Sequence, residues 1–265
     1  MYKRKYLKYF VSALLIGLFS CNQDKDNLRK GKPMKAQELN QKLTGIRERQ
    51  MDYGSVNLEA RVDSLNSNSR QSELVDLFLI NSSIKLDLKY ASADNFMKMR
   101  LYDTLTKAYL QKEVAERLGR CQEFLTAINN NLYLLVYDAV RPISVQKKMW
   151  DALDSIPVSQ RVKFVSNPAN GSIHNYGAAV DLTICDGRGI PLDMGAEYDD
   201  IRKIAYPSLE AQFLNSGELT QKQLDNRKLL RKVMTSQNFR NIPTEWWHFN
   251  AFSRDIVKLK YAALK

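Results

Sequence analysis

The chain contains only two histidines, and each lies in a short motif that also carries a carboxylate. His174 precedes Asp181 by seven residues, and Glu245 precedes His248 by three. Two imidazoles and one carboxylate form the ligand set of a catalytic zinc site that keeps one coordination position open for water. The sequence therefore predicts one zinc ion per chain, bound by His174, Asp181 and His248, with Glu245 as a candidate general base.

The residues around this ligand set favour hydrolysis. A carboxylate at the open position could accept a proton from a zinc-bound water, whose pKa zinc lowers to about 7, and pass it to a leaving amine. Trp246 and Trp247 adjoin Glu245, and a partly desolvated setting would raise the pKa of this carboxyl. The oxyanion that develops on the substrate also needs a preorganised cation. Arg141, at the end of a predicted buried strand, is our candidate, because its planar fork suits a carbonyl or a carboxylate.

An iron(II) site is the main alternative for the same three ligands, since non-haem oxygenases also use two histidines and one carboxylate. Their common first pair is much closer in sequence than His174 and Asp181, and they have no need of Glu245. The helical zinc motif H-E-x-x-H is absent. Hydrolytic zinc is therefore the favoured interpretation.

These side chains meet only if the backbone around them has a suitable shape. Gly177 lies between His174 and Asp181 and allows a bend that brings both side chains to one point. On a flat strand Glu245 and His248 would point to opposite faces, so we expect a twist, bulge or turn there. Hydrophobic periodicity and turn residues predict strands at 74–79, 84–88, 132–137 and 177–184, and helices at 104–129, 145–153 (with Ser144 as its N-cap), 209–213 and 221–234.

The first 20 residues resemble an export signal. Four basic residues precede an uncharged run of 11 residues, Tyr9 to Phe19, which is too short for a helix that spans a bilayer. Cys21 follows Ser20 as in a bacterial lipoprotein cleavage box, although Phe19 departs from that pattern and a plain cleaved signal is the alternative. We therefore expect a signal peptide at 1–20, a lipid-anchored polar tether at 21–71, a catalytic domain at 72–265 and a location in the bacterial cell envelope facing the periplasm, with the membrane reached through a lipid on Cys21.

Composition narrows the range of partners. The net charge of +11 would fall to about +7 without the signal, because that segment carries four basic residues and no acid. We find no arginine-rich stripe interleaved with aromatic residues, so nucleic acid is not an expected partner. Cys121 and Cys185 are the only other cysteines. They are expected to be small buried side chains, and the sequence does not determine whether they pair.

The motifs as a set resemble those of a known family. Ser172-x-His174-x-x-Gly-x-Ala-x-Asp181 and Glu245-x-Trp-His248 are similar to the two zinc motifs of the D-alanyl-D-alanine dipeptidases of the VanX type. These belong to a larger group of zinc peptidases that includes D,D-carboxypeptidases acting on peptidoglycan stems. The similarity covers about residues 75–255 and extends through three further stretches, 86–96, 137–142 and 193–199.

The resemblance implies a fold and a set of roles. The expected fold is α+β, with helices around a small, mainly antiparallel sheet that carries the site. His174, Asp181 and His248 would bind zinc, Glu245 would be the base and Arg141 would stabilise the transition state. Asp199 resembles the acid that holds the free amino group of the dipeptide, and Ser172 would help to orient substrate.

The chain departs from the family pattern at two places, and the second, in a loop at the front of the domain, concerns the substrate more than the chemistry. Tyr198 stands where the family pattern has Phe. After Asn95 and Phe96 the chain reads Met-Lys-Met-Arg-Leu-Tyr in place of a glycine-bearing loop. The expected reaction is hydrolysis of D-alanyl-D-alanine or a related small dipeptide. The alternatives are a zinc D,D-carboxypeptidase acting on stem peptides, or a non-catalytic zinc lipoprotein that binds wall peptide.

Overall fold

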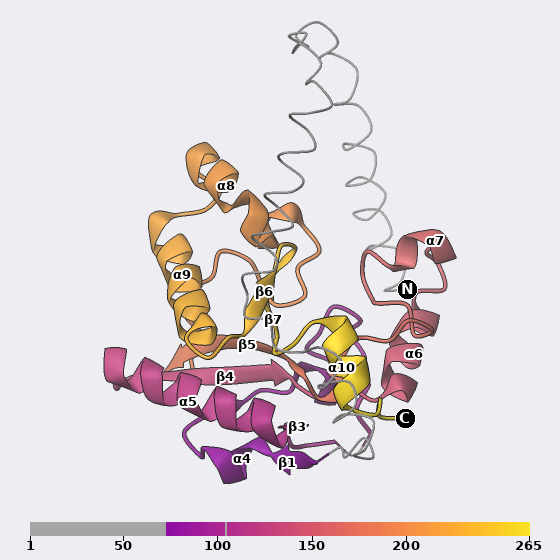
Figure 1. Cartoon of the computed structure of the whole chain (residues 1–265). Coiled ribbons are helices and arrows are strands. Elements are labelled where there is room, and N and C mark those ends of the chain that lie inside the picture. The colour runs from indigo at the N-terminus through magenta and orange to yellow at the C-terminus, as the bar shows by residue number, and fades with distance from the viewer. Residues whose placement is uncertain (1–72, 104) are drawn as a thin grey trace, which may run out of the picture. The chain divides into compact units, whose positions relative to one another are not determined.

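The computed structural model describes residues 73–103 and 105–265, so the predicted signal peptide and tether lie outside the described residues (Figure 1). A five-stranded sheet and a two-stranded ribbon are surrounded by helices, which confirms the α+β fold class. In chain order the elements are β1 (Leu74–Asp76), α4 (Leu77–Ile80), β2 (Lys85–Leu86), η1 (Lys89–Ala91), β3 (Tyr109–Gln111), α5 (Lys112–Ile128), β4 (Leu132–Asp138), α6 (Ile143–Ala152), α7 (Val158–Arg161), η2 (Ile173–Tyr176), β5 (Ala179–Asp186), η3 (Lys203–Ala205), η4 (Pro207–Leu209), α8 (Glu210–Ser216), α9 (Gln221–Thr235), β6 (Arg240–Ile242), β7 (Glu245–Asn250) and α10 (Arg254–Lys260).

The main sheet has the strand order β2-β4-β5-β7-β6. Only the short β2 runs parallel to its neighbour; the β4–β5, β5–β7 and β6–β7 pairs are antiparallel. β5 lies at the centre, and all of its residues except Asp186 are buried. β5 consists of small and branched residues after Gly177, interrupted by the buried polar side chains of Asp181 and Thr183, and it lies largely within the strand predicted at 177–184.

Two long helices pack on this sheet. α5 lies along β4, and α9 packs beside it against β5 and β6 (Figure 1). Val114 and Leu118 of α5 and Leu230 and Val233 of α9 are fully buried in the same core as Leu182 of β5. Among the described residues, no helix has the length and apolar character needed to cross a membrane.

The two cysteines of the described region belong to the packed interior. Cys121 on α5 and Cys185 on β5 are free thiols and both are buried. Burial raises the pKa of the Cys121 thiol to about 12, so the thiol stays neutral. The expectation of small buried side chains is confirmed for both residues.

The structure corrects the predicted elements near the start of the domain. The strand predicted at 74–79 ends at Asp76, because the Asp76 carboxylate accepts a hydrogen bond from the Phe78 backbone N–H and caps α4. The helix predicted from residue 104 begins only at Lys112, because residues 109–111 pair with β1. In both places, pairing between distant segments overrides the local pattern.

The predicted N-cap of α6 is wrong. α6 begins at Ile143, so Ser144 lies inside its first turn and Pro142 takes the N-cap position without a side-chain hydrogen bond. The Pro142 carbonyl instead accepts the backbone N–H of Gln146. Proline is compatible with a helix start because its fixed φ suits the backbone there.

Candidate active site

Three neighbouring strands place polar side chains side by side across the sheet. The register pairs Asp138 of β4 with Asp181 of β5, and Asp181 with His248 of β7. The β4–β5 pairing shifts between Val136 and Asp138. Without this shift Tyr137 would face Asp181, so the irregularity is what brings Asp138 into the row. Bulges of this kind are frequent beside active sites, where they re-aim a side chain.

His174 reaches the row from the 3₁₀ helix η2. The Ser172 Oγ accepts the His174 backbone N–H at 3.4 Å, and the Asn175 Oδ1 accepts the Ser172 N–H at 2.5 Å, which together form a capping box. The helix ends at Gly177 with φ of 64°. A Cβ at Gly177 would lie 2.8 Å from the Leu74 Cδ2. The bend predicted at this glycine is therefore present, and its surroundings leave no room for a side chain.

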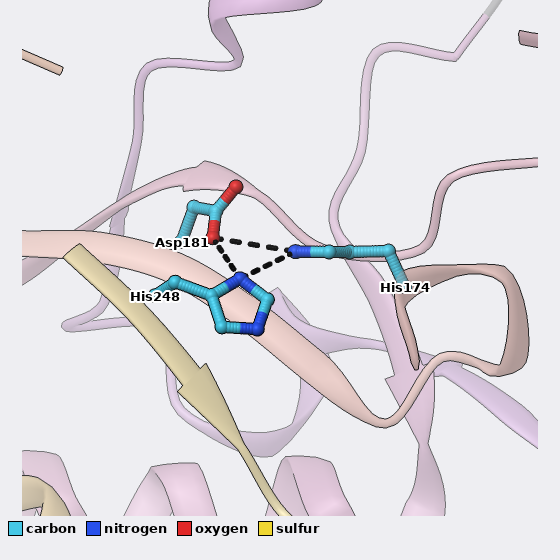
Figure 2. Close-up of side chains that lie close together, drawn as sticks. All are labelled: His174, Asp181 and His248. Atoms are coloured by element: carbon cyan, nitrogen blue, oxygen red, sulfur yellow. Dashed lines mark hydrogen bonds and ion pairs between the residues drawn. The ribbon is translucent and has the colours of Figure 1, made fainter. Parts of the chain in front are cut away.

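His174, Asp181 and His248 point their polar atoms at one another (Figure 2). The His174 Nε2 lies 3.2 Å from the His248 Nδ1 and 3.2 Å from the Asp181 Oδ1, and the His248 Nδ1 lies 2.9 Å from that oxygen. Ligand atoms about 2 Å from a tetrahedral metal lie about 3.3 Å from one another. These three atoms therefore have nearly the spacing that one tetrahedral ion requires.

The hydrogen bonds around the two histidines leave the inward nitrogens available as ligands. The His174 Nδ1 lies 2.6 Å from the Ala139 carbonyl oxygen, and the His248 Nε2 lies 2.9 Å from the Asn250 Oδ1. An N–H on each of these outer atoms would leave a lone pair on the His174 Nε2 and the His248 Nδ1. Metal-binding histidines have such partners in nearly all known sites. The donor set fits one metal ion.

Asp181 and the two histidines stabilise one another's charged forms. Burial disfavours the charged forms, but the Asp181 hydrogen bond and charge outweigh it and raise the pKa of His248 to about 9. The histidines in turn hold the pKa of Asp181 well below its usual range, despite burial. A metal ion would therefore have to displace a proton from His248 at neutral pH.

Glu245 lies beside this cluster, at the start of β7. Its Oε2 is 3.8 Å from the His248 Nδ1, and 39% of its side chain is exposed. Partial burial raises the pKa of Glu245, an effect that the positive charge of His248 counteracts. A carboxyl with a raised pKa at a reachable position is suited to accept and return a proton.

The β6–β7 pairing explains how Glu245 and His248 share one site. Ile242 pairs with Glu245 and Asn241 with Phe249, so three β7 residues lie between two consecutive β6 partners. The Asn241 side-chain amide donates to the carbonyls of Glu245 at 2.9 Å and His248 at 2.8 Å and so holds the irregular segment. The predicted irregularity is confirmed.

Arg141 lies on the other side of Asp181, buried to 7% exposure. Its Nε and Nη2 donate to the Asp138 Oδ2, its Nη1 donates to the Gln146 Oε1, and its Nη2 is 3.6 Å from the Asp181 Oδ2. The Tyr90 ring lies 4.9 Å from the guanidinium carbon. Although burial opposes it, the charge of Asp138 raises the pKa of Arg141, so the group stays cationic.

Asp199 joins the site through Tyr90. The Tyr90 hydroxyl lies 3.2 and 3.1 Å from the two carboxylate oxygens of Asp199, which has a left-handed φ of 61°. Burial, together with the negative charge of Asp181, raises the pKa of Asp199 well above its usual range. Backbone strain and a desolvated acid in one residue are both typical of a functional position.

The structure thus brings five of the seven predicted site residues into one cluster around Asp181 and links Asp199 to it through Tyr90. It shows Ser172 as the cap that orients His174. Sequence reasoning assigned no role to the residues that hold them: Asp138, Tyr90, Asn250, Tyr198 and Asn241. A signal did exist for Asn250, because residues two apart on a strand share a face. The role of Asp138 could also have been predicted from the sequence, because an acid lies there three residues before Arg141.

A buried His–His–Asp cluster with an adjacent carboxylate and a fixed arginine defines a metal-dependent hydrolase. Comparison with known families makes this specific: the M15 peptidase model described as "D-ala-D-ala dipeptidase" matches residues 70–262. The chain belongs to this family of metallopeptidases.

Individual relatives of known sequence carry the name of the same activity. The D-alanyl-D-alanine dipeptidase of Escherichia coli K12 is 34% identical over 181 residues, which cover 68% of this chain and 86% of the relative. The D-alanyl-D-alanine dipeptidase of Synechocystis is 30% identical over 168 residues, covering 53% of this chain and 68% of the relative. A solved structure titled "VanYB in complex with D-Alanine-D-Alanine" is 14% identical with a TM-score of 0.31, covering 59% of this chain and 79% of that one. The family assignment depends on the sequence matches.

Proposed function

We propose that the chain hydrolyses D-alanyl-D-alanine, or a closely related small dipeptide, with zinc at the His174, Asp181 and His248 cluster. The observation that carries this proposal is the partly buried carboxylate of Asp199, held by the Tyr90 hydroxyl beside Arg141. A free dipeptide places an ammonium group a few ångströms from its scissile bond. The relatives named D-alanyl-D-alanine dipeptidase support the choice of substrate.

Zinc in this ligand set would supply a Lewis acid and a water of lowered pKa. Glu245 takes the water proton on its carboxylate as the water oxygen bonds to the peptide carbon, and returns it to the leaving nitrogen as the C–N bond breaks. The raised pKa of Glu245 suits both transfers. Arg141, fixed by Asp138, donates to the oxygen that becomes negative.

Asp199 accounts for a restriction to short substrates. A desolvated carboxylate is unfavourable unless a cation pairs with it. The α-ammonium of a dipeptide supplies that cation, whereas an acylated or longer peptide has no charge at this position. The proposal therefore predicts strong discrimination against blocked substrates, because such substrates leave the Asp199 carboxylate without a cation.

The experiment compares D-Ala-D-Ala with its N-acetyl analogue as substrates of the zinc-loaded protein. Cleavage of the free dipeptide alone supports the proposal. Preference for the blocked or longer peptide would indicate a D,D-carboxypeptidase. Absence of turnover on every D-amino-acid peptide would indicate a protein that only binds wall peptide.

Two variants test the assignment of the base. Glu245→Gln keeps the size of the side chain and should keep bound zinc, while lowering kcat by about 10²–10⁴-fold. Glu197→Gln, an exposed position near Asp199, is the matched control and should behave as the wild type. Loss of zinc from Glu245→Gln would instead indicate that this carboxylate is a ligand.

We also propose that the enzyme works in the cell envelope, anchored by a lipid on Cys21. The basic start, the short apolar run and the position of Cys21 support this. Expression of the wild type and of Cys21→Ala, followed by membrane fractionation, tests it. Release of Cys21→Ala from the membrane fraction is the expected result, and equal retention of both forms would contradict the anchor.

A further inference from the structure

The two oxygens of Asp181 have different surroundings. Oδ1 faces the two histidines, at 3.2 Å from the His174 Nε2 and 2.9 Å from the His248 Nδ1. Oδ2 points the other way and accepts a hydrogen bond from the Tyr198 hydroxyl at 3.1 Å. The Arg141 Nη2 lies 3.6 Å from the same oxygen. One oxygen is therefore directed at the metal position and the other is engaged elsewhere.

Tyr198 has little freedom to move. Its ring contacts the Tyr137 ring at 4.9 Å and the Trp247 ring at 5.4 Å, between centroids, and lies 6.1 Å from the Tyr90 ring. Tyr137 and Trp247 are both buried, on β4 and β7. Aromatic contacts from two strands of the sheet thus fix the phenol, and the position of its hydroxyl follows from the packing.

We propose that Tyr198 is a positioning residue that holds Asp181 as a one-oxygen ligand and so keeps the remaining coordination position open for water. A carboxylate can bind a metal through one oxygen or two. A donor on Oδ2 opposes its rotation towards the metal and stabilises the one-oxygen arrangement. Partners of this kind orient metal ligands and alter metal affinity.

This inference rests on the proposed zinc function, but it assigns a task that the ligand set alone does not require. Phenylalanine at position 198 would keep the aromatic contacts and remove only the hydrogen bond. Tyr198→Phe is therefore a test of one hydroxyl. Tyr137→Phe is the matched control, because the described residues show no hydrogen bond from the Tyr137 hydroxyl, although its ring touches Tyr198.

Two measurements on the purified protein avoid dependence on turnover. The first is the zinc dissociation constant, by competition with a chromophoric chelator. The second is the visible absorption of the Co²⁺-substituted protein, which weakens as the coordination number rises, because coordination geometry determines the spectrum. Thermal unfolding of the zinc-free proteins checks that each variant folds.

Tyr198→Phe should bind zinc about tenfold or more weakly, and its Co²⁺ absorption should fall, whereas Tyr137→Phe should match the wild type within about twofold. Wild-type zinc affinity together with an unchanged Co²⁺ spectrum in Tyr198→Phe would overturn the inference. Weaker zinc binding by Tyr198→Phe, together with no cleavage of D-Ala-D-Ala by the wild type, would contradict the proposed function and still support the role of Tyr198. A wild-type protein that binds no zinc would overturn both.

Discussion

The Oδ2 oxygen of Asp138 accepts two hydrogen bonds from Arg141, at 2.9 Å from Nε and 2.5 Å from Nη2. Asp138 is fully buried, and it also accepts the Tyr102 hydroxyl on its other oxygen. Arg141 is thus held in one orientation before any substrate arrives. Preorganisation of this kind makes a cation effective at a developing negative charge, because no group has to move during the reaction.

Arg141→Ala and Arg141→Lys should separate catalysis from stability. Arg141→Ala leaves the Asp138 carboxylate buried without its partner, and we expect a loss of about 3–5 kcal/mol in the free energy of unfolding. Arg141→Lys keeps a positive charge but cannot form the two parallel hydrogen bonds of the guanidinium. It should therefore be more stable than Arg141→Ala and still have a kcat about 10²-fold below that of the wild type. Urea unfolding and steady-state kinetics measure the two effects. Equal stability of both variants would contradict the buried pairing.

Asp199→Asn should stabilise the protein at neutral pH while impairing catalysis. Burial raises the pKa of Asp199 well above its value of 3.8 in model compounds. The folded state therefore holds this proton more tightly than the unfolded state, and the wild type loses stability as the pH rises from about 4 towards the folded pKa. The asparagine variant lacks that loss.

Thermal unfolding at pH 4 and pH 8 tests this account of Asp199. The variant should have the higher Tm at pH 8 and a smaller advantage at pH 4, and its KM for free dipeptide should rise. An advantage that does not depend on pH would show that the Asp199 carboxylate is not the cause.

Asn250→Ala should weaken metal binding without changing any ligand. The Asn250 Oδ1 is the partner of the His248 Nε2 at 2.9 Å and fixes which nitrogen of the imidazole is free. Loss of such a partner lowers metal affinity by about 10–100-fold. The control is Asn131→Ala, at an exposed position that is far from Asn250 in the sequence. Chelator competition gives the dissociation constants, and equal values would exclude a role for Asn250.

Gly177→Ala should destabilise the fold by more than Gly217→Ala does. Both glycines have left-handed φ angles, 64° and 78°, where alanine costs about 1–2 kcal/mol. A Cβ at Gly177 would also lie 2.8 Å from the Leu74 Cδ2, whereas at Gly217 nothing lies within 4 Å. The difference between the two losses in urea unfolding isolates the steric effect. Equal losses would mean that Leu74 moves aside freely.

The clustering of His174, Asp181 and His248 could be predicted from the sequence because histidine is rare in this chain and its neighbours carry the carboxylates. β4 could be predicted because it is a nearly continuous apolar run, and β5 because small and branched residues follow Gly177. The hydrogen bond from Tyr198 to Asp181 could not be predicted from the sequence, because it depends on how the segment after Pro191 packs across the sheet. β3 was missed for the same reason: it is only three residues long and exists through its pairing with β1, whose strand was predicted but extended too far.

Asp181 and His248 are paired neighbours on β5 and β7, yet they lie 67 residues apart in the chain. A metal ion held by both would close a long loop in the way a covalent cross-link does, and cross-links of long loops limit the freedom of the unfolded chain. Local opening of β7 would then require release of the ion. Amide hydrogens of β7 should accordingly exchange with solvent more slowly in the zinc-loaded protein than in the chelated protein. A metal ion at this site would then also stabilise the strand that carries Glu245.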